Sequence, residues 1–310
     1  MSEKSSFNPA DANVITRHYL DSILIEERII DAKKASLQTE IFGETFSTPI
    51  MMPAFSFLRT FVKERENAMV EYSRAAQELN MVNWVGMMEN DEFADALATG
   101  ARTVRIIKPF ADTDKVLDQI AFAEKNGAFA VGMDIDHVFG DNGEYDVVAD
   151  YPMKRQTKED IRSYVEASGL PFIVKGVLSV SDAVKCAEAG AKGIVISHHR
   201  GRMPFAIPPL MVLPEIKKAL GDGCGMELFV DCGINTGADA YKALALGAKA
   251  VSVGRAIMPG LASEGTEGVK KYVTGMNQEL ATIMGYTGIA STEDFVPDTL
   301  WMNGRRLTAE

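Results

Sequence analysis

The stretch DAVKCAEAGAKGIVISHHRGR, from Asp182 to Arg202, decides the predicted fold. Its first half has the pattern of a helix that Gly190 ends, and an apolar strand follows at once. A second stretch, DAYKALALGAKAVSVGRA from Asp239 to Ala256, repeats this design with Gly247 as the helix stop. Helix, glycine and strand in immediate succession are what βα units around one sheet require.

Eight apolar runs of strand length alternate with amphipathic stretches along the chain. Eight βα units in roughly 250 residues predict an α/β fold, a closed parallel (β/α)8 TIM barrel with a short helical N-terminal extension. A doubly wound open sheet is the alternative. We expect one domain over residues 1–310, with the extension at 1–48, the barrel at 49–285 and a tail at 286–310. The predicted strands begin at Pro49, Met81, Thr103, Ala128, Pro171, Gly193, Glu227 and Ala250.

Composition limits the partners and the compartment. The 310-residue chain has a formal net charge of -11, so its surface repels nucleic acid and anionic membranes. No apolar run approaches the roughly 20 residues of a membrane helix, and the first residues lack the order of a secretory signal. Three cysteines without zinc-site spacing argue against a disulfide framework or a metal site. We therefore expect a cytoplasmic protein that binds no metal, nucleic acid or membrane.

Polar residues follow several predicted strands, and in a parallel barrel these strand ends surround one active-site mouth. A histidine there is more often a packing residue, Lys175 could belong to a structural ion pair, and Arg202 could be a solvated loop charge. A functional interpretation is that a carboxylate fixes the tautomer of a histidine base, while an arginine binds a substrate carboxylate. The residues at this mouth are Asp134, Asp136, Lys175, His198, His199, Asp231, Gly254 and Arg255.

Two further segments favour a binding site at the same end. Gly233 and Gly237 surround the start of a predicted helix, and Gly254 with Arg255 ends the eighth strand. The loops after strands seven and eight of such barrels often hold phosphate with backbone N–H groups and a helix N-terminus. The loop that follows strand four, residues 137–160, is long and rich in Gly and Asp, which is typical of a lid or a functional insert.

Residues 171–202 and 230–271 resemble the FMN-dependent α-hydroxy-acid oxidases and dehydrogenases, which include glycolate and lactate oxidases. The family's S-N-H-G-G/A-R motif aligns with Ser197 to Arg202. The resemblance implies FMN as cofactor and oxidation of a small 2-hydroxy acid to a 2-oxo acid. It implies His199 as base, Asp136 as the carboxylate that orients it, Arg202 as carboxylate clamp and Lys175 as the cation beside the flavin.

The resemblance also implies the cofactor contacts and a homo-oligomer, in which a tetramer is possible. Lys108, His199 and Arg202 are the implied substrate-binding residues. The implied FMN-binding residues are Ala54, Phe55, Ser56, Gly86, Lys175, Ser197, Asp231, Gly233, Asn235, Gly254 and Arg255.

This sequence departs from the family at several of these positions. Asn235 replaces a phosphate-binding arginine, Lys108 replaces an active-site tyrosine, and Asp134 replaces a flavin-side hydroxyl. His198 replaces an asparagine and Arg200 a glycine. A second substrate arginine and an N-terminal tyrosine have no match.

These departures keep other functions open. One alternative retains FMN but acts on a larger or less acidic substrate, or as a reductase or isomerase. Another is a barrel that has lost catalysis and serves as a binding protein. A third is a flavin-free enzyme that binds a sugar phosphate.

Overall fold

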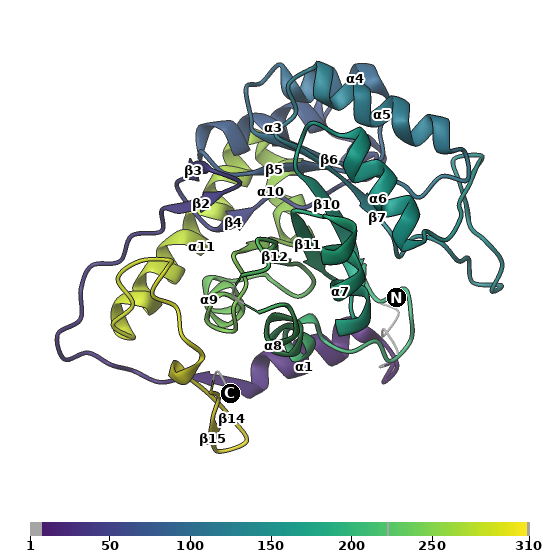
Figure 1. The fold of residues 1–310 in the computed structure, drawn as a ribbon. Coiled ribbons are helices and arrows are strands. Elements are labelled where there is room, and N and C mark those ends of the chain that lie inside the picture. Colours follow the sequence, from purple (N-terminus) through teal and green to yellow (C-terminus); the bar gives the residue numbers. More distant parts are fainter. Residues whose placement is uncertain (1–7, 222, 309–310) are drawn as a thin grey trace.

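The eight predicted strands form one parallel sheet that curls into a barrel. The computed structural model describes residues 8–221 and 223–308. Strand order around the sheet is β4-β13-β12-β11-β10-β7-β6-β5, and helices surround the strands (Figure 1). The strands are β4 (Ile50–Met51), β5 (Asn83–Val85), β6 (Thr103–Ile107), β7 (Ala130–Asp134), β10 (Phe172–Val177), β11 (Gly193–Ile196), β12 (Glu227–Val230) and β13 (Ala250–Ser252).

Backbone hydrogen bonds close the ring between its first and last strands. The Met52 N–H donates to the Val82 carbonyl at 3.0 Å, and the Gly86 N–H donates to the Phe55 carbonyl at 2.7 Å. An open doubly wound sheet would leave these two edges apart. The barrel is therefore the correct architecture.

Helix ends follow the glycine pattern of the sequence. Gly190 ends α7 in the left-handed region with φ 92°, and Gly247 follows α9 with φ 107°. Each lets the chain turn directly into the next strand, as the two repeated stretches predict. The barrel helices are α3 (Ala68–Glu78), α4 (Asn90–Leu97), α5 (Thr113–Lys125), α6 (Lys158–Ala167), α7 (Val180–Ala189), α8 (Pro209–Leu220), α9 (Gly237–Ala245) and α11 (Thr266–Tyr286). The short helices are α2 (Leu58–Phe61), η1 (Arg255–Ile257) and α10 (Met258–Glu264).

The barrel interior is apolar at its N-terminal end. Trp84, Ile106, Ile173 and Phe229 belong to one buried cluster. The hairpin of β2 (Thr39–Ile41) and β3 (Glu44–Phe46) covers this end: the Phe46 ring lies 5.4 Å from that of Phe129 between centroids. The polar residues at the strand ends, which are the candidates for catalysis, therefore lie at the opposite end of the barrel.

The N-terminal extension is only partly helical. Helix α1 (Ala12–Ser22) is followed by β1 (Ile23–Ile25), which pairs with β14 (Leu300–Met302) of the tail. The tail also contains η2 (Pro297–Thr299) and β15 (Arg305–Arg306). The expectation of a helical extension is thus correct for α1. The later strands of the extension form because β1 has a partner in the tail, and β2 and β3 pair with each other.

The loop of residues 137–160 folds as a short hairpin, called here the insert loop. It contains β8 (Val147–Val148) and β9 (Tyr151–Pro152) and leads into α6.

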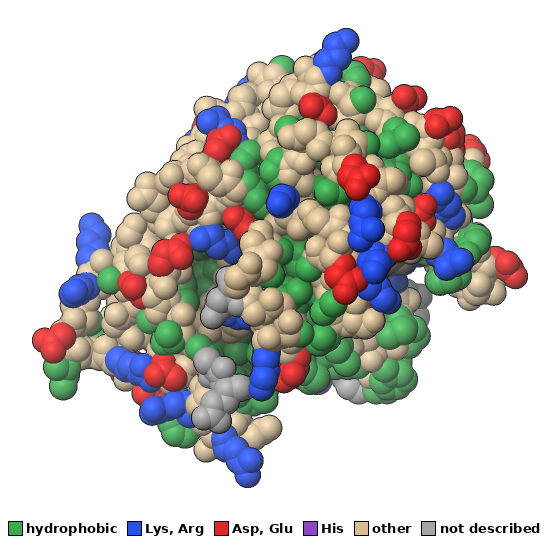
Figure 2. Space-filling view, in the orientation of Figure 1, with side chains coloured by type: hydrophobic (Ala, Val, Ile, Leu, Met, Phe, Trp, Pro, Cys, Tyr) green, Lys and Arg blue, Asp and Glu red, His purple; other side chains and the backbone are tan. Residues whose placement is uncertain are grey.

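On the face seen in Figure 2, acidic and basic side chains are interspersed among apolar ones. Within residues 8–221 and 223–308, no helix has the length and apolar character to cross a membrane.

Gly132 on β7 tests the packing between neighbouring strands. A Cβ at this position would lie 2.2 Å from the Ile173 carbonyl oxygen, so Gly132→Ala should lower the free energy of unfolding by about 1–3 kcal/mol. The measurement is a urea unfolding midpoint. Gly275→Ala on α11, where a Cβ has open space, is the matched control and should stabilise by about 0.5–1 kcal/mol. Equal effects of the two changes would contradict this account.

Candidate active site

Three charged side chains lie in one row at the C-terminal ends of β6, β7 and β10. Ile107 pairs with Met133, and Lys175 pairs with Asp134, so the strand register places Lys108, Asp134 and Lys175 side by side. The Nζ of Lys108 lies 2.6 Å from Asp134 Oδ2, and the Nζ of Lys175 lies 3.0 Å from Oδ1. All three side chains are buried, with residue exposures of 5%, 3% and 6%.

The two ammonium groups keep the Asp134 carboxylate ionised. Burial opposes its charge, but Lys108 and Lys175 outweigh burial and hold the pKa of Asp134 well below its ordinary value. Burial likewise opposes the charge of Lys175, yet Asp134 and Asp231 raise the pKa of Lys175 above its ordinary value. Asp231 Oδ2 lies 3.5 Å from the Lys175 Nζ. Lys175 is therefore a fixed cation over the working pH range.

A carboxylate–histidine pair stands beside this row. His199 Nδ1 lies 2.8 Å from Asp136 Oδ1, and its backbone N–H donates to Ser197 Oγ at 3.0 Å. Gly176 makes room for the pair, because a Cβ there would lie 2.3 Å from the carboxyl carbon of Asp136. The Asp136 contact favours the tautomer with the proton on Nδ1, which leaves Nε2 as the basic nitrogen.

A cleft of about 600 Å³ opens at this end of the barrel, within the range of small-molecule sites. It brings together residues from five strand ends, those of β4, β10, β11, β12 and β13, and from α1 with its N-cap. The predicted site residues that line it are Ala54, Phe55, Lys175, His199, Asp231, Gly233, Asn235, Gly254 and Arg255. Lining residues that the sequence interpretation missed include Asp11, Asn13, Arg17, Pro53, Arg200 and Cys232.

Six predicted site residues do not line this cleft: Ser56, Gly86, Ser197, Lys108, Asp136 and Arg202. Ser56 Oγ accepts the Met87 N–H at 2.8 Å and fills the space that a side chain on Gly86 would need. Ser197 is buried under His199, and Lys108 is engaged by Asp134. The first four of these residues support the walls of the cleft.

Arg202 lies in a neighbouring hollow of about 880 Å³, which Asp136 also lines. Its Nη2 donates to the Phe139 carbonyl at 2.7 Å and lies 3.3 Å from Asp146 Oδ2. Both partners belong to the insert loop. The structure thus ties the predicted carboxylate clamp to that loop.

His137 is a further member of the site that the sequence interpretation missed. Its ring is perpendicular to that of His199, with centroids 5.5 Å apart, and its Nε2 lies 3.1 Å from Asp146 Oδ2. Burial, followed by the charges of Lys108 and Arg202, lowers the pKa of His137 to about 4. Its place directly after Asp136 at a strand end was the signal that could have identified it.

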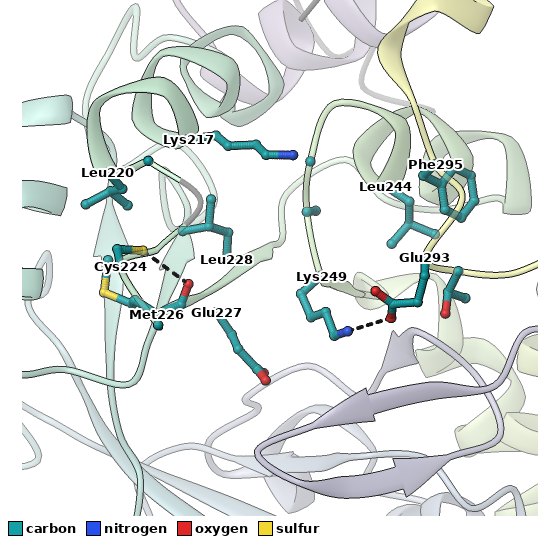
Figure 3. Close-up of a pocket in the computed structure, with 15 residues that line it drawn as sticks. Lys217, Leu220, Cys224, Met226, Glu227, Leu228, Leu244, Lys249, Glu293 and Phe295 are labelled. Atoms are coloured by element: carbon teal, nitrogen blue, oxygen red, sulfur yellow. Dashed lines mark hydrogen bonds and ion pairs between the residues drawn. The ribbon is translucent and has the colours of Figure 1, made fainter.

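Another cavity, of about 450 Å³, lies at the opposite end of the barrel between α8 and α9 (Figure 3). Its charged residues Lys249 and Glu293 pair with each other at 2.8 Å. Glu227 and Leu228 in its wall begin β12. Because catalytic residues of such barrels lie at the other strand ends, we assign this cavity no catalytic role.

The buried row can be tested by a double-mutant cycle. Asp134→Asn leaves two buried ammonium groups facing an amide, so we expect a loss of about 3–5 kcal/mol in the free energy of unfolding. Lys108→Met with Asp134→Asn should lose less than Asp134→Asn alone, because one uncompensated charge is removed. Urea unfolding measures both. Asp118→Asn, exposed on α5, is the control; strictly additive effects at positions 108 and 134 would contradict the coupling.

His137 should give stability a specific pH dependence. Its folded-state pKa of about 4 lies below the ordinary 6.5, so the unfolded chain gains a proton first as the pH falls. Folding stability therefore decreases between pH 6.5 and about 4 on account of this residue. The stability difference between wild type and His137→Gln should change across this window and be constant above it. A difference that does not vary with pH would exclude a buried neutral His137.

Comparison with known proteins identifies the family of this chain. The family described as FMN-dependent dehydrogenase matches residues 13–160 and 153–302. The 4-hydroxymandelate oxidase of Amycolatopsis orientalis is 28% identical over 90% of this chain and 86% of its own length. The L-lactate oxidase of Roseobacter sp. (strain GAI101) is 29% identical over 85% of this chain and 79% of its own. The crystal structure of mandelate oxidase with 3,3-difluoro-2-hydroxy-3-phenylpropionic acid superposes with a TM-score of 0.82 at 28% identity, covering 92% of this chain and 88% of that one. This chain therefore belongs to the FMN-dependent dehydrogenase family.

Proposed function

We propose that this protein oxidises a 2-hydroxy acid to the 2-oxo acid with FMN. The observation that carries the proposal is the 2.8 Å contact between His199 Nδ1 and Asp136, at the edge of a cleft that also contains Lys175. A base, its orienting carboxylate and a fixed cation are the groups that this reaction asks of the protein.

The cleft residues fit FMN. Pro53, Ala54 and Phe55 give a largely apolar wall suited to a flat ring system, and Asp231 can accept hydrogen bonds from ribityl hydroxyls. Arg200 and Arg255 supply positive charge for a phosphate. Ser56, Gly86 and Ser197 support these contacts from behind the wall.

The chain's own groups would then act on the substrate as follows. Bound FMN supplies the two-electron acceptor. As the Cα–H bond of the substrate breaks, His199 Nε2 would take the hydroxyl proton, and Asp136 would stabilise the resulting imidazolium. Lys175 would place a fixed positive charge beside the bound cofactor.

Arg202 and Lys108 have separate roles in this proposal. Arg202 binds the substrate carboxylate with the part of its guanidinium that the Phe139 carbonyl and Asp146 do not use. Lys108 is buried against Asp134, so a positioning role through Asp134 is favoured over direct substrate contact.

A second candidate keeps FMN but changes the substrate. The insert loop holds Arg202 and so shapes the space beside it. In this candidate the substrate that fits this space is an acid with a large side chain or a less acidic molecule. Anaerobic mixing with a panel of 2-hydroxy acids separates the two candidates, since the first predicts bleaching of the oxidised flavin band by simple members.

Removal of the proposed base gives the direct test. His199→Ala should retain bound flavin but reduce it with substrate roughly 10²–10⁴-fold more slowly, because positioned proton transfer is lost. Stopped-flow absorbance under anaerobic conditions measures the rate. His18→Ala, an exposed histidine on α1, is the matched control and should reduce at the wild-type rate. An unchanged rate in His199→Ala would refute the assignment.

We also propose that residues 1–310 form one domain that assembles as a homo-oligomer in the cytoplasm. The compartment is supported by three free cysteines, of which Cys232 has its pKa raised to about 12, mainly by burial. Cysteines that form no disulfide are typical of a reducing environment. Light scattering during gel filtration tests the assembly: a monomeric mass would rule out the oligomer.

A further inference from the structure

Arg200 occupies a position where the family that the sequence resembles has glycine. Asn235, which lines the same cleft, occupies the position of a phosphate-binding arginine. The chain has thus lost one guanidinium from the loop after β12 and gained one in the loop after β11.

A defined turn holds the Arg200 backbone at the cleft. Arg200 has φ 65° and follows His199 with φ 45°, both in the left-handed region. The Arg200 carbonyl accepts Asn13 Nδ2 at 2.8 Å, and the Gly201 N–H donates to His198 Nδ1 at 2.9 Å. His198 Nε2 in turn lies 2.8 Å from Thr16 Oγ1, so α1 fixes this turn.

Arg200 and Arg255 line the cleft without anionic partners. In residues 8–221 and 223–308 neither guanidinium forms an ion pair, whereas Arg17 in the same cleft binds Asp239 at 2.8 Å. Burial, and then the charge of Arg255, lowers the pKa of Arg200, so the two cations lie close enough to interact. Two like charges facing one cleft favour an anion there.

The N-terminus of α9 does not offer the alternative site that the glycine pattern suggested. Asp239 Oδ2 accepts the N–H groups of Asn235 at 3.0 Å and Thr236 at 3.1 Å. Glu279 Oε2 accepts the Gly237 N–H at 2.8 Å. Two carboxylates thus accept the N–H groups at the start of this helix. Arg200 and Arg255, which line the same cleft, therefore remain as the available phosphate ligands.

We propose that Arg200, together with Arg255, binds the terminal phosphate of FMN and takes over the contact that Asn235 cannot make. This inference rests on the proposed function, because it presupposes that FMN is the ligand of the cleft.

Comparing FMN with riboflavin isolates the phosphate contact. Both ligands are titrated into flavin-free protein and followed by flavin fluorescence. Wild type should bind FMN more tightly than riboflavin. Added salt should reduce this difference in affinity, because it screens the attraction between the arginines and the phosphate. Arg200→Gln should weaken FMN binding roughly ten- to hundredfold, the range for a hydrogen bond to a charged group, and leave riboflavin binding unchanged.

A compensating change sharpens the test. Asn235→Arg in the Arg200→Gln background should restore much of the FMN affinity, since it returns a guanidinium to the loop after β12. Arg102→Gln removes an exposed arginine paired with Glu44 at the far end of the barrel and should change neither affinity.

Failure of the phosphate assignment and failure of the proposed function would give different results. Equal loss of FMN and riboflavin affinity in Arg200→Gln, or no loss of either, would overturn the phosphate assignment alone, as would equal affinities of wild type for the two ligands at low salt. Wild-type protein that binds neither flavin would overturn the proposed function as well.

Discussion

The carboxylate of Asp134 is the interaction on which the candidate site depends. It lies between the ammonium groups of Lys108 and Lys175, at 2.6 and 3.0 Å, and all three side chains are buried. Without it two buried ammonium groups would lie next to each other, with Asp231, 3.5 Å from the Lys175 Nζ, as a remaining counter-charge. Asp134 therefore sets where the Lys175 charge stands relative to His199 and the cleft.

Much of the fold was predictable because it depends on local signals. Apolar runs gave all eight barrel strands, and Gly190 and Gly247 gave the helix ends. The site was predictable only as a set of strand ends. The partner of Lys108 follows from strand register, and that of Arg202 follows from the path of the insert loop; neither is encoded by spacing along the chain.

The contacts of helix α1 were likewise not predictable from the sequence. Its sequence predicted a helix but gave no sign that Thr16 would meet His198 or that Asn13 would meet the Arg200 carbonyl. These contacts join residues more than 180 positions apart. They explain why a histidine is tolerated where the family has asparagine: its two ring nitrogens link the turn to the extension.

The departures from the family become coherent when they are taken in pairs. Lys108 and Asp134 add one positive and one negative charge in direct contact, so the buried row keeps the net charge of a tyrosine and a hydroxyl. Arg200 and Asn235 gain and lose one guanidinium within one cleft, which keeps its positive charge constant. A flavin and its phosphate respond to the summed field of the nearby charges, whereas a substrate responds to the shape and position of individual groups. Changes that conserve charge but move side chains therefore retain the requirements of the cofactor while they alter the space beside His199. Divergence of this kind is expected of an enzyme that keeps its redox chemistry and changes the acid that it accepts.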